Sequence, residues 1–416
     1  FALVVSQSQE GSMHVANACV RCLSGDVLCR VPVNQQLPIE ALKASVAVAS
    51  GIPEAEQRLL LKGRELRSLE DVPVEAEVDI TLIRRPAEQA EWLDKISRKV
   101  DDLSQAPEPV REDREILFTA VRADDDALQW ASGDLQCDRA LVLEAVRRCG
   151  FALACAAERL QADREVVLSA VARHGLALEF AARALRGDRE VVLAAVEQDG
   201  NAFQYADSQL RNDPEFVLEA VMRNGYALTY ASPELRGVRE IVVAAIERTG
   251  WIYEAGEAVV QFGGWALQSA SSTLQADRGL VLAAVQRDGA ALAFSPELQA
   301  DEEVVLAAVR QCGEALAFAA PKLRADRQVV LAAIHQTGMA LEFASADLRD
   351  DESLVLQAVQ RRGAALRWAS PRVRGLREVV LAAVRLDEDA LQCASLELQS
   401  DRHVRRTARR CARVER

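Results

Sequence analysis

The segments 163-DREVVLSAVARHGLALEFAARALRG-187 and 188-DREVVLAAVEQDGNAFQYADSQLRN-212 stand in register at a period of 25 residues. Self-similarity at a fixed period of this size is the sequence signature of a repeat protein. The same frame recurs along most of the chain, with starts at Asp113, Asp138, Asp163, Asp188, Asp213, Val238, Asp277, Asp301, Asp326, Asp351, Leu376 and Asp401.

The residue at the frame start predicts where each helix begins. Ten of the twelve frame starts are Asp, and an Asp before an apolar run caps a helix because its carboxylate accepts backbone N–H bonds and faces the positive helix end. Glu often follows two residues later, as at Glu165 and Glu190. Val238 and Leu376 replace the Asp. The backbone N–H groups at those two helix starts should therefore bind other acceptors, or the helix start should be kinked.

A glycine follows most of these helices and predicts where they end. Gly175 comes after the apolar run that contains Val166 and Val171. A glycine just past a helix can adopt a positive φ, which would end the helix sharply. A shorter helix should follow. In one repeat Ser232 would be the N-cap of a further helical turn, with Pro233 at its first position. Each repeat is therefore predicted to be a helical hairpin plus a turn.

One such unit has too little apolar surface to offset the entropy of ordering its backbone, so each must share its faces with its neighbours. The predicted fold class is mainly α: an α-solenoid of 25-residue repeats, preceded by a small β-grasp domain described below. The units resemble a family of short helical repeats known only as a domain of unknown function. That resemblance covers roughly residues 111–403 and implies a scaffold without any known activity.

Bulk composition excludes several classes of protein. The chain has 416 residues, half of them hydrophobic and 27% charged, so it is not disordered. Its net charge of −13 argues against broad nucleic-acid or anionic-membrane binding. Nine scattered cysteines indicate reduced thiols in a cytoplasmic or nuclear protein. No run is apolar enough to span a bilayer. Because the sequence starts at Phe1 rather than Met, a preceding targeting segment is left open.

Residues 13–86 have a different pattern, with alternating stretches around Val15–Leu23 and Val27–Val33 on either side of Ser24-Gly25-Asp26. This spacing predicts a hairpin, followed by a helix from Pro38 to about Ser50 and by strands around Leu59–Leu61 and Val78–Ile83. The stretch 38-PIEALKASVAVASGIPEAEQRLLLKGREL-66 resembles the central part of ubiquitin. The resemblance implies an α+β ubiquitin-like domain.

The ubiquitin resemblance has two functional implications. The C-terminal diglycine is absent, since Arg84-Arg85-Pro86 runs on into more chain, so conjugation to substrates is not expected. The positions of the hydrophobic recognition patch are occupied by Leu23, Leu60 and Thr81. Two hypotheses stay open: a weak partner-binding surface, or an inert domain that keeps only the fold.

Residues 87–110 are predicted to link this domain to the repeats. Glu88–Leu103 reads as a helix with Trp92, Ile96 and Val100 on one face, which Pro107 and Pro109 then break. Its simplest role is to cap the exposed N-terminal face of the array. The remaining predicted boundaries are 1–12 for a disordered N-terminal segment, 111–403 for the array and 404–416 for a basic C-terminal cap helix or tail.

No catalytic, cofactor or metal site emerges from the sequence, and the protein is predicted not to be an enzyme. Cys19 and Cys22 have the spacing of half a zinc site, but no second pair lies at zinc distance. The histidines, which lie far apart in sequence and outside any recognisable motif, are His14, His174, His335 and His403.

Aromatic residues supply the first candidate surface. One frame position is aromatic in most repeats, and two interpretations are open: packing against the next repeat, which is the commoner case, or a peptide-binding groove. The residues are Trp130, Phe180, Tyr205, Tyr230, Phe294, Phe318, Phe343 and Trp368. The frame between Val238 and Asp277 is also 39 residues long, which places an insertion near 251–264. Insertions in repeat arrays often carry function, and the candidate partner-binding residues here are Trp251, Tyr253, Phe262 and Trp265.

The tail supplies the second candidate surface. Its arginines follow helical spacing and would form a cationic stripe: Arg402, Arg405, Arg406, Arg409, Arg410 and Arg413. A solvated cap helix is the commoner explanation. The leading functional hypothesis is a non-catalytic scaffold that binds an unidentified protein partner, with a link to ubiquitin-pathway receptors. The alternative is a nucleic-acid-binding repeat protein that uses the arginine-rich tail, although nucleic acid and membrane are not the expected partners.

Overall fold

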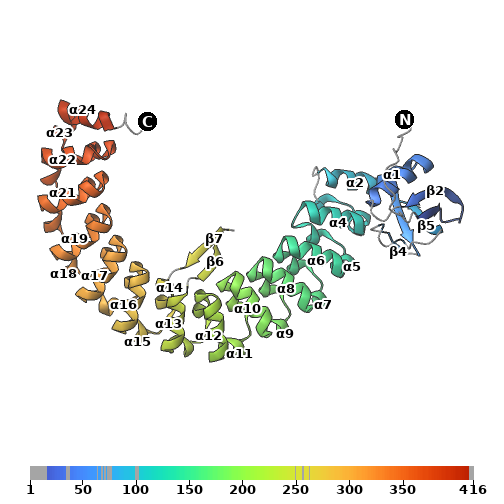
Figure 1. The fold of residues 1–416 in the computed structure, drawn as a ribbon, viewed down its shortest axis with the longest axis horizontal. Coiled ribbons are helices and arrows are strands. Elements are labelled where there is room, and N and C mark those ends of the chain that lie inside the picture. The colour runs from blue at the N-terminus through green and yellow to red at the C-terminus, as the bar shows by residue number, and fades with distance from the viewer. Residues whose placement is uncertain are drawn as a thin grey trace, which may run out of the picture. The chain divides into compact units, whose positions relative to one another are not determined.

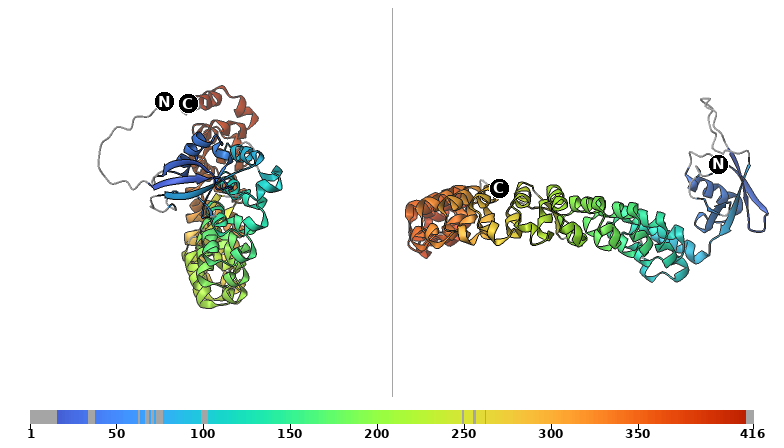
Figure 2. Two further views of the ribbon diagram at one scale, coloured as in Figure 1. Left: turned by 90° about the vertical axis from the view of Figure 1, so that its right-hand side faces the viewer. Right: turned by 90° about the horizontal axis from the view of Figure 1, so that it is seen from below.

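The computed structural model describes residues 16–33, 38–62, 64–66, 69, 72, 77–98, 103–248, 250–254, 257–261 and 263–411. It divides into two compact units, residues 1–148 with 155–157 and residues 149–154 with 158–416. The first unit contains a β-sheet domain and the first two long repeat helices. The second contains the other repeats, whose helices stack in a single row (Figures 1 and 2).

The β-sheet domain has the strand order β2-β1-β5-β3-β4, in which β1 and β5 are parallel and the other pairs antiparallel. Helix α1 packs onto the sheet through Leu42 and Val46, which are buried with Val20, Leu59 and Ile80. This arrangement is the one predicted from the ubiquitin resemblance. The elements are β1 Ala16–Arg21, β2 Val27–Val33, α1 Ile39–Ser50, η1 Glu54–Glu56, β3 Gln57–Leu61, β4 Arg64–Glu65 and β5 Glu77–Arg84.

Two turns of this domain require glycine. Gly25 in the β1–β2 turn has φ +92°, and Gly51 at the end of α1 has φ +74°. Residues that carry a side chain rarely adopt such a φ, which explains why glycine stands at both places. The hairpin predicted from Ser24-Gly25-Asp26 is confirmed, and the Cys22 amide donates to the Asp26 carbonyl at 3.0 Å.

The linker helix α2 (Ala87–Ser97) is shorter than the predicted Glu88–Leu103. Ile96 is buried and Trp92 half-buried, whereas Val100 lies outside the described residues. Two short turns follow, η3 (Leu103–Gln105) and α3 (Glu108–Arg111). Helix α2 packs against the first long repeat helix, so this segment does cover part of the N-terminal face of the array.

Each repeat has three parts rather than the two of a simple hairpin. A long helix comes first: α4 Arg114–Ala123, α6 Arg139–Arg148, α8 Arg164–Arg173, α10 Arg189–Gln198, α12 Pro214–Arg223, α13 Arg239–Glu247, α16 Arg278–Arg287, α17 Glu302–Gln311, α19 Arg327–Gln336, α21 Glu352–Arg361, α22 Arg377–Val384 and α24 Arg402–Cys411.

The predicted second helix is a 3₁₀ helix, followed by a single helical turn. The 3₁₀ helices are η4 Ala127–Trp130, η5 Gly150–Cys155, η6 Gly175–Phe180, η7 Gly200–Tyr205, η8 Gly225–Tyr230, η10 Gly289–Phe294, η12 Gly313–Phe318, η13 Gly338–Phe343, η14 Gly363–Trp368 and η16 Glu388–Cys393. The turns are α5 Gly133–Gln136, α7 Glu158–Gln161, α9 Arg183–Arg186, α11 Ser208–Arg211, η9 Leu235–Gly237, α15 Ser272–Gln275, η11 Pro296–Leu298, α18 Pro321–Arg324, α20 Ala346–Arg349, η15 Val373–Gly375 and α23 Leu396–Ser400.

The predicted insertion is a β-hairpin, β6 (Gly250–Glu254) and β7 (Glu257–Gln261). Helix α14 (Gly263–Ser269) then takes the place of a 3₁₀ helix. Strand β6 contacts η7, η8 and α10, so the hairpin folds back over the two repeats that precede it (Figure 1).

The predicted Asp caps are confirmed. Asp188 shows the pattern: its Oδ1 accepts the Glu190 amide at 3.0 Å and the Val191 amide at 3.1 Å. Val238 and Leu376 make no side-chain cap bond, as predicted, yet their backbones keep the same extended conformation. The helix starts are therefore unkinked but lack a hydrogen-bond acceptor.

Val238→Asp should restore this missing acceptor and stabilise the array by about 1 kcal/mol. Val238 has φ −86° and ψ 114°, close to the φ −81° and ψ 114° of the capping Asp163. Stability is measured by hydrogen exchange in α13, with Val238→Ala as the control because it removes the side chain without adding a cap. Equal protection in the two variants would contradict the prediction.

The glycine that follows most of the long helices is explained by packing, and the prediction of a positive φ at these glycines is wrong. Among the described residues only Gly25, Gly51 and Lys62 have positive φ. A Cβ on Gly313 would instead lie 2.5 Å from the Ala333 carbonyl oxygen, and one on Gly363 would lie 2.6 Å from that of Ala383. Glycine stands here because the long helix of the next repeat approaches the backbone too closely for any side chain.

Candidate interaction surfaces

The sheet of the ubiquitin-like domain presents the predicted patch on its outer face. Leu60 and Thr81 are register partners on β3 and β5. Both are half-buried, whereas the neighbouring Leu59, Ile80 and Leu82 point into the core. Alternation along a strand therefore places Leu60 and Thr81 on the face opposite the core.

Leu23, the third predicted patch residue, lies in the turn after β1 and is 74% exposed. Arg21, two residues earlier, is the register partner of Thr81 across β1 and β5. Arg58 and Ile83 form the next register pair on the outer face. Sequence reasoning missed this pair, although the period of two along both strands would have found it.

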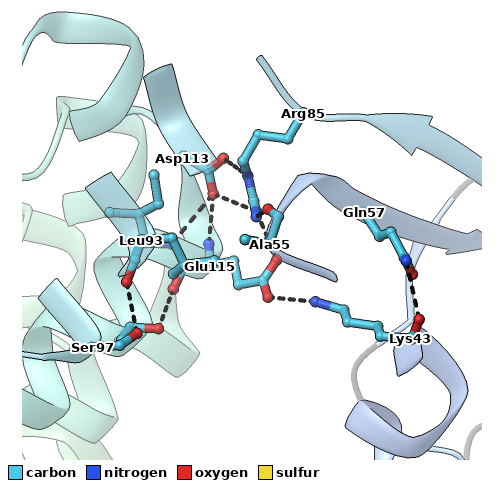
Figure 3. Close-up of polar contacts among 10 residues, drawn as sticks. Lys43, Ala55, Gln57, Arg85, Leu93, Ser97, Asp113 and Glu115 are labelled. Atoms are coloured by element: carbon cyan, nitrogen blue, oxygen red, sulfur yellow. Dashed lines mark hydrogen bonds and ion pairs between the residues drawn. The ribbon is translucent and has the colours of Figure 1, made fainter. Parts of the chain in front are cut away.

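A buried arginine joins the ubiquitin-like domain to the first repeat (Figure 3). The Arg85 side chain is 0% exposed. It donates to Asp113 at 3.0 and 3.3 Å, to Glu115 at 2.7 Å and to the Ala55 carbonyl at 2.8 Å. Lys43 of α1 also contacts Glu115 at 2.7 Å. Asp113 is the cap of α4, so the helix start itself is bound by the preceding domain.

The charges of this cluster stabilise one another. Burial disfavours the charged form of Arg85, but Asp113 and Glu115 outweigh it and raise the pKa of Arg85. Burial likewise disfavours the Glu115 carboxylate, yet Lys43 and Arg85 hold its pKa below the ordinary value. A depressed carboxylate pKa means that the contribution to stability is present above the unfolded pKa and is lost as the pH falls through the folded one.

The same contact recurs between successive repeats as a ladder of ion pairs. The arginine that follows one cap Asp reaches the cap Asp of the next repeat, as between Arg189 and Asp213 at 2.8 Å. This arginine-to-cap ladder comprises Arg114–Asp138, Arg164–Asp188, Arg189–Asp213, Arg239–Asp277, Arg278–Asp301, Arg327–Asp351 and Arg377–Asp401. In most repeats an arginine therefore bridges two adjacent helix starts.

Where the cap Asp is absent, the arginine that would bind it is absent as well. Val238 and Leu376 cannot accept an ion pair, and the residues one repeat earlier that would reach them are Pro214 and Glu352, neither of them an arginine. There is one exception: the cap Asp326 is present, although the preceding repeat has Glu302 instead of an arginine. In this chain the arginine and the cap that follows it are thus present together or absent together, with this one exception.

Arg85 reproduces the ladder contact atom by atom. Its Nε faces Asp113 Oδ2 and its Nη2 faces Asp113 Oδ1 and Glu115 Oε2. Arg278 uses the same three nitrogen–oxygen pairs toward Asp301 and Glu303. The ubiquitin-like domain thus takes the place of a preceding repeat, with the difference that Arg85 is buried whereas the Arg278 side chain is 47% exposed.

A cavity of about 450 Å³ lies beside this cluster, between α1 and the long helices α4 and α6. Its floor includes Ile39, Leu59 and Phe118, and the Arg114 guanidinium lies 4.4 Å from the Phe118 ring. Its cationic groups already have anionic partners, as in the Lys43–Glu115 pair. Among the described residues that line it, the cavity therefore offers no unpaired cationic group to a ligand.

The aromatic residues at the ends of the 3₁₀ helices are mostly half-buried, which fits packing better than an open groove. A different aromatic cluster forms where the insertion lies. Trp265 of α14 is 43% exposed, and its ring centroid lies 6.4 Å from Tyr226 and 6.3 Å from Phe294. Tyr226 also contacts Tyr230 at 6.2 Å. Sequence reasoning missed Tyr226, which connects the rings across two repeats.

The other predicted insertion residues are not brought to this cluster by any described contact. Trp251 and Tyr253 lie on β6, but their side chains are outside the described residues, as is Phe262. In the C-terminal helix α24, Arg402, Arg405, Arg406 and Arg409 are exposed. The Arg410 side chain and Arg413 fall outside the described part.

Groups suited to catalysis or metal binding are dispersed. Within the described residues no three His, Cys, Asp or Glu side chains could hold a metal ion. Cys19 is buried and Cys22 half-buried, and His174, His335 and His403 lie in separate repeats, while His14 is outside the described part. No described helix has the length and apolar character needed to cross a membrane.

The fold and the ladder define an α-helical repeat protein whose N-terminal domain is ubiquitin-like. A model of the family described as "domain of unknown function (DUF4116)" matches residues 113–161, 138–186, 188–236, 213–255, 277–324 and 326–374. These matches cover more than half of the chain, which therefore belongs to this family. No match to a curated protein was found.

Proposed function

We propose that this protein is a non-catalytic adaptor that binds one partner through the ubiquitin-like domain and others along the repeat array. The repeat array supports this function because its successive helices stack on one another through buried apolar residues, and a stacked array presents an extended surface to partners. The dispersed His and Cys side chains also favour binding over catalysis.

The single observation that carries the proposal is the register pair of Leu60 and Thr81 on the outer sheet face. This pair occupies the positions that ubiquitin uses for recognition, and the arginine link to the repeats is made by Arg85, beyond the end of β5. A ubiquitin-pathway receptor that presents an apolar helix face is the partner this surface fits. The Trp265 cluster, with Tyr226 and Phe294, is the corresponding candidate on the array.

Leu60→Ala is expected to weaken binding of such a receptor roughly tenfold, because truncating a central apolar anchor removes much of the contact energy. The probe is a synthetic helix of the ubiquitin-interacting type, and binding is measured by fluorescence anisotropy on the full chain. Val48→Ala is the matched control, since Val48 is 90% exposed on the helix side of the domain.

Equal loss of affinity in both variants, or no loss in either, would remove the outer sheet face from the proposal. No binding by the wild-type chain would remove the link to the ubiquitin pathway. The repeat array would then stand alone as the binding module.

A further inference from the structure

The last long helix, α24, differs from the others on the side that faces away from the array. In each earlier repeat the fifth and ninth frame positions are buried apolar residues, as Val192 and Val196 are. In α24 these positions are Arg405 and Arg409, and both are exposed. The fourth and eighth positions, Val404 and Ala408, remain buried at 0% and 1%. The helix is packed against its own array and charged on its outer side.

The charge on this helix is concentrated and uncompensated. Arg402, Arg405, Arg406 and Arg409 are exposed, and none has an ion-pair partner among the described residues. No acidic residue interrupts the helix. Arg402 and Arg406 are four residues apart, as are Arg405 and Arg409. Like charges at this spacing destabilise a helix. The stability of the helix therefore does not explain why four like charges gather here in a chain of net charge −13.

The repeat that precedes α24 also exposes apolar side chains. Leu386 is 50% exposed and Leu396 82% exposed. One repeat earlier the corresponding positions are Arg361 and Pro371. Leu386 lies just after α22 and Leu396 is the first residue of α23, and both of these helices pack against α24. The two adjacent repeats therefore expose leucine as well as arginine.

We propose that this C-terminal end face (Arg402, Arg405, Arg406 and Arg409, with Leu386 and Leu396) binds an acidic, amphipathic segment of another protein. The ladder indicates carboxylates as the ligands. At the frame position of Arg402, Arg278 binds the Asp301 and Glu303 carboxylates, and Arg164 binds those of Asp188 and Glu190. Arg402 itself has no ion-pair partner among the described residues.

The test uses the full chain and a fluorescent helical peptide of about 18 residues, with Glu spaced along one face and Leu beside it. The double variant Arg405→Glu with Arg409→Glu is expected to weaken peptide binding by at least about tenfold. A peptide with Gln in place of Glu should bind the wild type as weakly as the Glu peptide binds the double variant. Arg310→Glu is the matched control, because Arg310 is an exposed arginine on another long helix, α17. It should leave the affinity unchanged.

Leu396→Ala provides a second variant that leaves every charge in place, and it should also weaken the peptide. Circular dichroism checks that the variants keep their helix content. Equal binding by the double variant and the control would overturn the proposal, as would no binding by the wild type. Tighter binding of a single-stranded RNA of about 16 nucleotides at the same arginines would also overturn it and assign the face to nucleic acid.

Discussion

Gly313→Ala is expected to destabilise its part of the array by about 2–3 kcal/mol. The added Cβ would meet the Ala333 carbonyl oxygen at 2.5 Å and the Thr337 side chain at 2.8 Å. The carbonyl belongs to the backbone of a packed helix, α19, and cannot move without shifting the whole repeat. The loss is measured as reduced hydrogen-exchange protection in η12 and α19.

Gly375→Ala is the control for this prediction. Its Cβ would have no neighbour closer than the Ser395 hydroxyl at 3.9 Å, and its φ is not positive. Alanine should therefore be tolerated and even stabilise by about 0.4–1 kcal/mol, since it restricts the unfolded chain. If both substitutions gave the same loss, conformational freedom rather than close helix packing would explain the glycines.

Arg85→Met is expected to lower the stability of the ubiquitin-like domain and of α4 by about 3–5 kcal/mol. Methionine fills much of the volume but leaves the Asp113 carboxylate, 1% exposed, without its cation. An uncompensated buried charge is the costly result of removing one partner. Hydrogen exchange in β5 and α4 measures the effect, because a repeat protein does not unfold in one step.

Two further variants separate the buried link from an ordinary ladder contact. Arg164→Met removes a ladder pair whose arginine side chain is 45% exposed, so little change is expected. Adding Asp113→Asn to Arg85→Met should recover part of the stability, because the fully buried carboxylate is then removed while Glu115 keeps Lys43 as its partner. A small effect of Arg85→Met by itself would contradict the assignment of the ubiquitin-like domain as the first element of the array.

The helix starts of the array could be predicted from sequence because capping is local. An Asp and the two amides it binds lie within four residues, so the frame of Asp113, Asp138 and their successors located every long helix. The absence of a cap at Val238 and Leu376 was predictable for the same reason. The matches to the repeat family cover this same part of the chain.

The role of the glycines was mispredicted because it depends on tertiary contact. A glycine after a helix is compatible both with a positive φ and with a close neighbour, and no local signal separates the two. At position 313 glycine is required because of contact with Ala333, twenty residues away in the next repeat. The location of the insertion followed from the frame, but its β-hairpin did not.

The ladder left a signal that sequence analysis could have used. Arg164 and Arg189 each precede the next cap by 24 residues, and Pro214 and Glu352 depart from the pattern where the next cap is missing. Arg85 had no such signal, because it lies outside the repeat frame. Only the structure shows that it binds Asp113. The patch residues Leu60 and Thr81 were predictable from the ubiquitin resemblance, and their role in binding stays a prediction.

The central claim is that neighbouring repeats are stable only together, and hydrogen exchange across the Gly313→Ala variant tests it most directly. The amides of α17 and α21, which flank the disturbed α19, should lose protection along with it, while α8 and α10 several repeats away should change little. Loss confined to the altered repeat, with both neighbours as protected as in the wild type, would contradict the claim.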